Sequence, residues 1–442
     1  MKLLNVDTLD QAREKLLSRA KLWTIKTEIV PSPDSSGRIL AGDLFASQDI
    51  PGFRRSTVDG YAVISGDTSG AGESSPVFLT LAGSVSMGKP ADFSLCPGEC
   101  AYVPTGGMLP EGADAMVMVE YTEASGKNIM VYEPAAPGMG LAEAGEDLAK
   151  GDLLLSGGTL IRPQETGALA AAGVTKIPVF SPLSISLIST GDEIVPPEAE
   201  PCPGEVRDIN SFALRALAMK RGYNVISVLV LPDDEERLEA ALRNEIITSD
   251  IVAISGGSSQ GEKDLTADLI GRVAKPGVFT HGLAMKPGKP TILGWDDESK
   301  TLLAGLPGHP VSALMVFELL LGWLPGAVIS EQFKMKNEKI KKNNEEFEIN
   351  NEQLSFNNEK FMNIGKREFP VPARISCNLP GAAGRTLCQP VVLRYAEDGY
   401  LAEPVFGKSG MITTLTRSDG YIIVDLNREG LKKGEPVLVH LF

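Results

Sequence analysis

The sequence lacks the features that mark several common classes of protein. Its 442 residues include only three histidines and five cysteines, and Cys96 and Cys100 in CPGEC have no second Cys/His pair nearby to complete a zinc site. Basic residues are outnumbered, with 42 Lys and Arg against 57 Asp and Glu, for a net charge of -15. Because nucleic acids are held by basic surfaces, this balance argues against a nucleic-acid partner. It leaves room for an anionic small ligand in a local basic pocket.

No stretch has the pattern of a secretion signal or of a membrane span. The N-terminus, MKLLNVDTLDQAREKLL, has no apolar core followed by a cleavage site. The most apolar run, VSALMVFELLLGWLPG, contains Glu318 and meets Pro325 too soon to cross a bilayer. We therefore expect a cytoplasmic protein without a membrane partner, whose length leaves room for about three domains.

The known phosphate-binding loops are also missing, although SGGSSQGEKD looks like one. Gly256 and Gly261 have the spacing of a P-loop, but Glu262 stands where the lysine of that loop belongs. The G-x-G-x-x-G turn of dinucleotide-binding folds is absent from the same stretch. The ligand of this segment therefore has to be inferred from its neighbours.

The periodicity of apolar residues predicts several modules. Residues 7–20 read as an amphipathic helix capped by Asp7 or Thr8. From about 45 to 140, short β-like runs between Gly and Pro turns indicate a small all-β module, and residues 145–180 return to mixed structure. From 183, the apolar strands LSISLIST, VISVLVL and DIVAISGG alternate with helices, one of them capped by Asn210 or Ser211. This alternation predicts an open doubly wound α/β domain that binds ligands at the carboxyl ends of its strands.

The end of the chain combines two different compositions. Residues 333–366 are rich in Lys, Glu and Asn and poor in apolar residues, which predicts a linker or insertion, with a partner-binding arm as the alternative. A second small β-rich module follows, from VPARISCNL to EPVLVHLF.

Five polar, glycine-rich segments follow strands of the predicted α/β domain. Because the carboxyl ends of parallel strands meet at one edge of a sheet, we expect these segments to form one site. Lys286 and Lys289 lie three apart in a proline-stiffened loop and repel each other unless an anion joins them, although two solvated surface lysines are the alternative. The segments are STGDEIV (189–195), GEVRDINS (204–211), SGGSSQGEKD (255–264), MKPGKP (285–290) and GLPGHPVSA (305–313).

The same segments carry acids and hydroxyl groups. A carboxylate cluster beside a lysine pair suits a phosphate bridged by Mg²⁺, and serine hydroxyls with glycine N–H groups can donate to phosphate or ring oxygens. The acids are Asp192, Glu193, Asp208 and Asp264, and the donors are Ser255, Gly256, Gly257, Ser258 and Ser259.

Three further residues have simpler interpretations. Asp59 precedes Gly60 in the β module, and the simplest interpretation is a turn residue that bonds its own backbone. His281 and His309 lack metal-binding spacing and read as ordinary loop histidines.

Seven segments occur along the chain in a characteristic order: RSTVDGYAV, TGGMLPEGADAMVMVE, AGEDLAKGD, STGDEIV, SGGSSQGEKD, MKPGKP and GLPGHPVSA. Together they resemble the molybdopterin molybdenumtransferase family, the MoeA-type proteins related to the gephyrin E domain. The resemblance runs from the N-terminal helix to the final strand and is interrupted by the low-complexity stretch.

This resemblance implies an elongated subunit that forms a homodimer, with an α/β domain similar to the stand-alone molybdopterin adenylyltransferase. The implied reaction inserts the metal of molybdate into adenylylated molybdopterin and releases AMP, with Mg²⁺ assisting. The adenylyltransferase and downstream cofactor-handling proteins would be partners. The expected domains are mixed α/β domain I (1–45 and 140–180), β-rich domain II (46–139), α/β domain III (181–328) and β-rich domain IV (329–442).

The resemblance also assigns roles to individual residues. Lys286 and Lys289 would bind the oxyanion, helped by Arg385 of GRTL and Ser409 of GKSGM. Asp208 and Asp264 would hold Mg²⁺ and the adenylate phosphate. The acids expected to act in catalysis are Asp59, Asp147, Glu193 and Asp264, with Asp59 reaching the cleft from the other subunit of the dimer. The remaining substrate-binding positions are Ser255, Gly256, Gly257, Ser259, Pro307, Pro310 and Thr105.

Three positions depart from the family pattern. Ala142 stands where many members have an arginine, His309 replaces the common asparagine of Gly-Asn-Pro, and TGGMLPEG replaces a Thr-Gly-Ala-Pro turn.

Tungstate has the charge and shape of molybdate, so a tungstate-specific enzyme is one alternative. An adenylyltransferase would leave the β modules unexplained. A gephyrin-like scaffold without activity predicts lost lysines and acids, and these are present.

Overall fold

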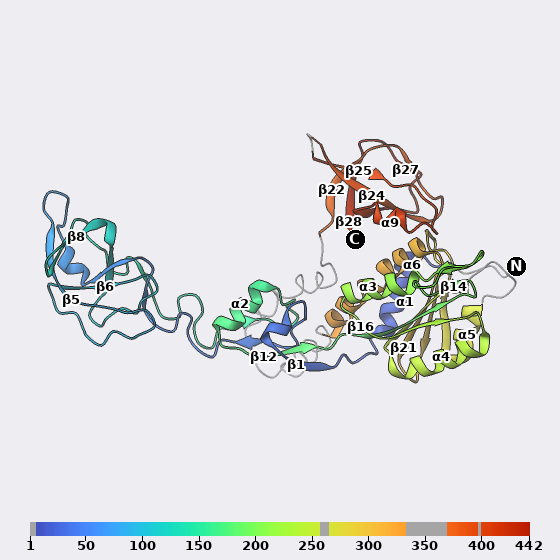
Figure 1. The fold of residues 1–442 in the computed structure, drawn as a ribbon, viewed down its shortest axis with the longest axis horizontal. Helices are drawn as coiled ribbons and strands as arrows, with labels where there is room; N and C mark the ends of the chain where they lie inside the picture. Colours follow the sequence, from blue (N-terminus) through green and yellow to red (C-terminus); the bar gives the residue numbers. More distant parts are fainter. Residues whose placement is uncertain (1–5, 257–264, 333–368, 397–398) are drawn as a thin grey trace, which may run out of the picture. The chain divides into compact units, whose positions relative to one another are not determined.

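The structure is a computed structural model that describes residues 6–256, 265–332, 369–396 and 399–442 (Figure 1). The chain divides into two compact units, one formed by Ile29–Val179 and the other by Met1–Glu28 together with Phe180–Phe442. The predicted linker at 333–366 and most of SGGSSQGEKD lie outside the described residues.

The larger unit contains the expected α/β sheet. Its six strands lie in the order β16-β13-β17-β21-β20-β18. Four of them are parallel, and the last two form an antiparallel hairpin at one edge. The predicted doubly wound α/β class is confirmed, with this hairpin added. The strands are β13 (Ser184–Thr190), β16 (Asn224–Leu231), β17 (Ile251–Ser255), β18 (Pro276–His281), β20 (Ile292–Asp296) and β21 (Thr301–Leu306).

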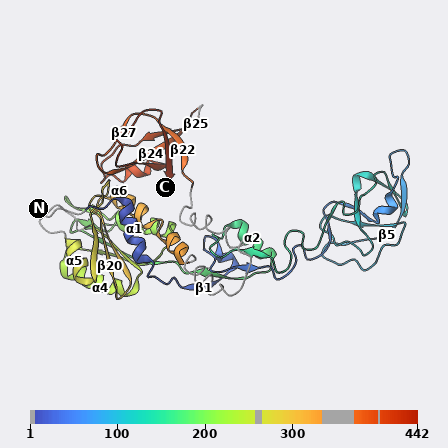
Figure 2. The same ribbon diagram turned by 180° about the vertical axis from the view of Figure 1, so that it is seen from behind.

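Helices cover both faces of this sheet, which is why β17 and β21 are buried along their whole length. Helices α3 (Asn210–Lys220) and α6 (Pro310–Val316) lie on one face, and α4 (Glu235–Thr248) and α5 (Leu265–Val273) on the other (Figures 1 and 2). Asp234 caps α4 by accepting the N–H of Arg237 at 2.9 Å. The prediction that Asn210 or Ser211 caps α3 is wrong, because both lie inside the helix and the carboxylate of Asp208 accepts the Ser211 N–H at 3.1 Å.

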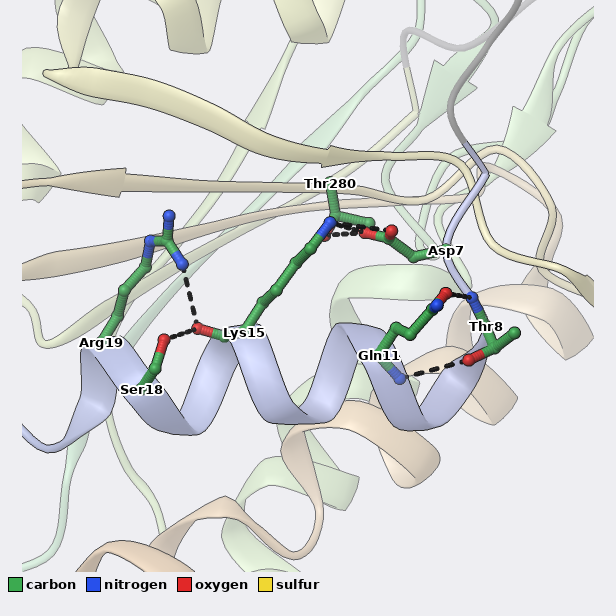
Figure 3. A network of polar contacts seen from close by, with 7 residues as sticks. All are labelled: Asp7, Thr8, Gln11, Lys15, Ser18, Arg19 and Thr280. Atoms are coloured by element: carbon green, nitrogen blue, oxygen red, sulfur yellow. Dashed lines mark hydrogen bonds and ion pairs between the residues drawn. The ribbon is translucent and has the colours of Figure 1, made fainter.

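Helix α1 (Leu9–Ala20) begins with a capping box at Thr8, one of the two caps that the sequence indicated. The Thr8 hydroxyl accepts the N–H of Gln11 at 3.2 Å, and the Gln11 side chain accepts the N–H of Thr8 at 2.9 Å (Figure 3). Asp7, the other candidate for the cap, instead accepts hydrogen bonds from Lys15 and from the Thr280 hydroxyl of β18, both at 2.7 Å (Figure 3). Asp7 therefore ties the start of α1 to the α/β sheet.

The N-terminal helix belongs to the larger unit. Its apolar face is buried, and the guanidinium of Arg13 donates to the carbonyl of Leu319 at 2.8 Å. Helix α1 thus lies in the unit that contains most of the α/β domain, whereas the sequence analysis grouped 1–45 with 140–180. The difference arises because an amphipathic pattern shows which face of a helix is buried and not what covers it.

The most apolar run forms a helical path over Pro310–Gln332, from α6 through η4 (Phe317–Leu321) to a helical segment at 324–332. By length and composition alone this path could cross a membrane, but 72% of its apolar window is buried within the protein, as in the core helix of a globular domain. The expectation that Pro325 would end the run is wrong, because Pro325 lies in the first turn of the last segment, where its missing N–H costs no hydrogen bond. Glu318 forms a nearly buried ion pair with Arg221.

The C-terminal sheet shares a strand with the α/β domain. Its strands lie in the order β19-β24-β25-β22-β28-β26, with β24 and β26 also paired. The edge strand β19 (Met285–Lys286) comes from the MKPGKP loop, and in parallel register Met285 lies opposite Thr386 and Lys286 opposite Leu387. The other strands are β22 (Val371–Ile375), β24 (Thr386–Ala396), β25 (Gly399–Pro404), β26 (Gly420–Val424) and β28 (Pro436–Leu441).

The smaller unit is built on a six-stranded sheet in the order β7-β4-β6-β5-β9-β8. Helix α2 (Pro163–Ala171) and short strand pairs complete the unit. The sheet strands are β4 (Gly60–Val63), β5 (Val77–Ser84), β6 (Glu99–Val103), β7 (Ala115–Met118), β8 (Thr122–Ser125) and β9 (Asn128–Val131). The short pairs join β1 (Thr27–Pro31) to β12 (Lys176–Phe180), β2 (Leu44–Phe45) to β11 (Leu153–Leu155), and β3 (Arg55–Ser56) to β10 (Leu141–Ala142).

Candidate functional site

Hydrogen bonds join three of the predicted segments at the carboxyl edge of the parallel strands. Strand β17 ends at Ser255, which is 2% exposed. The amide nitrogen of Asn210, at the start of α3, donates to the Ser255 hydroxyl at 2.6 Å and to the carbonyl of Gly308 at 2.7 Å. The Ser255 hydroxyl in turn donates to the carbonyl of Pro307 at 3.5 Å. GEVRDINS, the first residue of SGGSSQGEKD, and GLPGHPVSA therefore meet here.

Gly256 brings a fourth segment, STGDEIV, into the same place. Its φ of +118° is one that glycine adopts most readily. A side chain at this position would place its Cβ 2.1 Å from the carbonyl oxygen of Thr190, at the end of β13. The ends of β13 and β17 can approach this closely only because residue 256 has no side chain.

Asp208 is held at this edge by a small parallel ribbon. Strand β14 (Ile194–Val195) pairs with β15 (Val206–Arg207), and the N–H of Asp208 donates to the carbonyl of Val195 at 2.9 Å. The carboxylate is 6% exposed and accepts hydrogen bonds from the N–H and hydroxyl of Ser211 and from the Ser189 hydroxyl at 3.5 Å. In the described part of the chain, no group of three or more His, Cys, Asp or Glu residues could hold a metal ion. Mg²⁺ that binds together with a substrate phosphate nevertheless needs only one or two protein carboxylates, because phosphate oxygens and water supply its other ligands.

The structure adds one acid that the sequence analysis did not single out. Asp233 follows β16, and its carboxylate accepts the Thr190 hydroxyl at 2.6 Å. Its N–H donates to the carboxylate of Asp192 at 3.0 Å. The position of LPDD directly after an apolar strand was the signal that could have identified it. The predicted acid Glu193 is exposed, and its carbonyl accepts the N–H of Val206 at 2.7 Å.

The lysine loop reaches the same edge of the sheet. Ile292, which follows the loop, lies opposite Gly305 near the end of β21. The loop backbone is tightly packed, since a Cβ on Gly288 (φ +120°) would lie 2.5 Å from the Val316 side chain of α6. The side chains of Lys286 and Lys289 are exposed, so the packed backbone presents two positive charges at the surface.

The C-terminal module contacts this edge at Ser409 and at Thr386, the residue that follows Arg385. The Ser409 hydroxyl hydrogen-bonds the Nδ1 of His309 at 2.8 Å, and the Ser409 carbonyl accepts the N–H of Val311 at 3.1 Å. His309, a departure from the family pattern, thus directly contacts a predicted oxyanion-binding residue. Arg385 is exposed and precedes Thr386, whose N–H donates to the carbonyl of Ala284 at 2.8 Å, beside the lysine loop.

The other predicted positions are accounted for as follows. Pro307 and Pro310 are buried, with Pro310 at the first position of α6. Gly257, Ser259 and Asp264 lie outside the described residues.

Two residues predicted from the β module lie together in the smaller unit. The carboxylate of Asp59 accepts the N–H of Thr105 at 2.8 Å, and both residues are exposed. Asp59 therefore bonds a second turn, which differs from the simpler interpretation of a bond to its own backbone. Asp147 is exposed in the same unit, and its N–H donates to the carbonyl of Ile50 at 3.0 Å. Ala142 lies directly opposite Arg55 in the β3–β10 pair.

Three family models match most of the chain. Residues 7–173 match the MoeA N-terminal region (domain I and II). Residues 186–326 match a model described as "Probable molybdopterin binding domain", and residues 372–442 match the MoeA C-terminal region (domain IV).

Relatives and solved structures agree with these models. A protein of Methanocaldococcus jannaschii named for molybdopterin biosynthesis is 30% identical over 94% of this chain and 92% of its own length. The molybdopterin molybdenumtransferase of Haemophilus influenzae is 33% identical over 71% of this chain and 76% of its own length. The crystal structure of a molybdopterin biosynthesis MoeA protein from Pyrococcus horikoshii OT3 is similar, with a TM-score of 0.76, 29% identity, and coverage of 99% of this chain and 100% of that one.

Proposed function

Because the chain belongs to the molybdopterin molybdenumtransferase family of MoeA-type enzymes and so to molybdenum cofactor biosynthesis, we propose that it inserts the metal of molybdate into adenylylated molybdopterin and releases AMP. One observation carries the proposal. The carboxyl edge of the sheet gathers buried hydrogen-bonding groups and an exposed lysine pair within one set of loops.

The buried part of this edge suits the nucleotide-bearing half of the substrate. Ser255, Asn210 and the close approach at Gly256 form a fixed surface of hydroxyl, amide and backbone groups. Such neutral, preorganised groups orient a polar ligand without needing to compensate a buried charge. They support binding of a nucleotide already joined to a pterin.

The exposed part suits the oxyanion. Lys286 and Lys289 carry two positive charges on one stiff loop, and a dianion relieves their mutual repulsion. The loop is paired with the C-terminal sheet next to Arg385, and Ser409 is bonded to His309 at the start of α6. These groups would bind molybdate beside the pterin.

We also propose that Mg²⁺ assists the reaction. The carboxylate of Asp208, together with that of Asp264 outside the described residues, would hold the ion. When bound, it would neutralise charge on the phosphates of the substrate. Asp208 itself positions the start of α3 through its bonds to Ser211, which keeps Asn210 at the edge of the sheet.

The acids Asp59, Asp147 and Glu193 and the turn at Thr105 would act in the same reaction. The enzyme would be a homodimer located in the cytoplasm.

Release of AMP tests this function directly. The purified protein is given adenylylated molybdopterin and Mg²⁺, with either molybdate or tungstate at micromolar concentration, and AMP is quantified by chromatography. We expect AMP release that depends on the oxyanion. Release that is independent of both oxyanions would overturn the proposal, and a preference for one of them identifies the metal.

The lysine pair supplies the sharpest variant for this assay. Lys286→Ala is expected to reduce oxyanion-dependent AMP release roughly 10- to 100-fold, because a charge-assisted contact contributes about 1.5–3 kcal/mol. The fold should be unaffected, since the side chain is exposed. Lys433→Ala is the matched control, because Lys433 is an exposed lysine of the same unit whose only described bond here is made by its backbone N–H, to Asn378. Equal activity of the two variants would show that the oxyanion binds elsewhere.

A further inference from the structure

Asn210 has an orientation that its neighbours determine. The carbonyl of Gly308 can only accept a hydrogen bond, so the group that faces it at 2.7 Å must be the amide nitrogen of Asn210. The same nitrogen donates to the Ser255 hydroxyl, which is then free to donate to the carbonyl of Pro307. Both hydrogens of the Asn210 amide are thereby used, and its oxygen must point away from these partners.

That oxygen is the unusual feature. Asn210 is 8% exposed, and within the described residues its Oδ1 is buried without a hydrogen-bond partner. Buried acceptors are nearly always bonded in folded proteins, because leaving one unpaired costs about 1–3 kcal/mol. The unpaired oxygen lies on a side chain held in place by β17 and by the segment before α6, at the edge where the loops of the site converge.

We propose that the Oδ1 of Asn210 accepts a hydrogen bond from an O–H or N–H group on the nucleotide half of the substrate, which makes Asn210 a specificity-determining residue. This inference rests on the proposed function and deepens it. The donor belongs either to a ribose hydroxyl or to the amino group of the adenine. A donor-bearing ligand satisfies the oxygen, and a ligand without that donor leaves it buried and unpaired.

The test is a cycle that combines protein variants with nucleotide analogues. Binding of AMP to the full chain is measured by isothermal titration calorimetry and compared with binding of 2′-deoxy-AMP, 3′-deoxy-AMP and inosine monophosphate. The wild type is expected to bind one analogue roughly 5- to 10-fold more weakly than AMP, the effect of one lost hydrogen bond. Which analogue is weakened identifies the donor.

Two variants of Asn210 separate the role of its oxygen from its structural role. Asn210→Ala should abolish the difference between AMP and the sensitive analogue, because no acceptor remains. Asn210→Asp retains an acceptor oxygen and loses the amide donor, so it should bind all nucleotides more weakly while keeping the discrimination. A purely structural role would lower every affinity by the same factor. Asn224→Ala, at the exposed opposite end of β16, is the matched control and should behave as the wild type.

Each result decides the proposal. The proposal is overturned if Asn210→Ala still discriminates between the nucleotides as the wild type does, or if Asn210→Asp no longer discriminates. It is also overturned if the wild type binds AMP and all analogues equally, or binds no AMP. If Asn210→Ala does not fold, Asn210→Asp and the wild type still give the decisive comparison. Oxyanion-dependent AMP release by the wild type is measured in parallel. Its absence refutes the proposed function, whereas its presence with unselective nucleotide binding refutes only the role of Asn210.

Discussion

The two ends of the six-stranded sheet use similar polar residues in different ways. At the amino-terminal end of the parallel strands, the carboxylate of Asp250 accepts both the N–H and the hydroxyl of Ser184 at 2.7 Å. At the same end, Asp296 accepts the N–H of Lys275 at 3.0 Å and two hydrogen bonds from Ser299. At the carboxyl end, by contrast, the side-chain oxygen of Asn210 has no partner among the described residues, and the lysine loop presents its charges to solvent.

This contrast separates residues that stabilise the fold from residues that we propose to bind a ligand. A polar group bonded to its neighbours in the same protein stabilises the elements that it joins. A polar group that is positioned by neighbours but retains an unused donor or acceptor gains from a ligand. The residue type alone does not make this distinction, since asparagine, serine and aspartate occur at both ends or beside them.

The largest effect is expected from a side chain at residue 256. Gly256→Ala would place a Cβ 2.1 Å from the Thr190 carbonyl at a φ of +118°, which we expect to reduce the free energy of unfolding by about 3 kcal/mol or more. Unfolding in urea can be followed by tryptophan fluorescence. All three tryptophans, Trp23, Trp295 and Trp323, belong to the unit of residues 1–28 and 180–442, so the signal reports on this unit alone.

A second glycine provides the control for this experiment. Gly271 lies in α5, and a Cβ there would have no atom within 4 Å. Gly271→Ala should therefore be neutral or stabilise the helix by up to about 1 kcal/mol. If both variants unfolded at the same urea concentration as the wild type, the close approach of β13 and β17 would be incorrect.

An intermediate effect is expected at the other end of the sheet. Asp250→Ala removes the acceptor for two hydrogen bonds from Ser184, and we expect a loss of about 2 kcal/mol in the free energy of unfolding. The rate of AMP release per folded molecule should be unchanged, because the residue lies at the end opposite the site. Asp250→Asn keeps one acceptor and should lose less stability. A variant with normal stability and impaired AMP release would reverse the assignment of the two ends.

The smallest effect concerns pH. Burial by itself would raise the pKa of the Asp296 carboxyl, but hydrogen bonds from Ser299 and Lys275 outweigh it, so that its pKa is lower than usual. A lowered pKa in the folded state gives stability that is present above the ordinary aspartate value of about 3.9 and is lost as the pH falls through the folded-state pKa. Asp296→Asn should therefore cost about 1 kcal/mol or less at pH 7, and the difference from the wild type should shrink below about pH 4. Urea midpoints measured between pH 7 and pH 3 test this, and a difference independent of pH would contradict it.

Much of the α/β domain was predictable because its signals are local. LSISLIST and DIVAISGG are continuous apolar runs, and such runs form strands that are buried on both faces. The cap at Thr8 and the proline at the start of α6 also act within a few residues of themselves. The antiparallel β18–β20 hairpin was not predicted, because an apolar run carries no information about the direction of its strand.

The candidate site was predictable in part for the same reason. Glycine-rich and charged segments after strands can be recognised one by one, and the strand-end rule places them at one edge. The contacts of Asn210 were missed, since the sequence suggested only a helix cap, and Asp233 was not singled out. In both cases the decisive partner is distant in the sequence: Gly308 lies 98 residues from Asn210, and Thr190 lies 43 residues from Asp233.

The sequence by itself determined which segments become strands, helices and turns, and which of them carry polar groups suited to an anionic ligand. These properties depend on interactions between residues that are close along the chain. Only the tertiary structure decided which polar groups are paired and which are left open, because hydrogen bonds between loops depend on the order of the strands and on how closely their ends approach. Gly256 illustrates both contributions. The sequence specifies a glycine at this position, but the Thr190 carbonyl that leaves no room for a side chain there belongs to another strand.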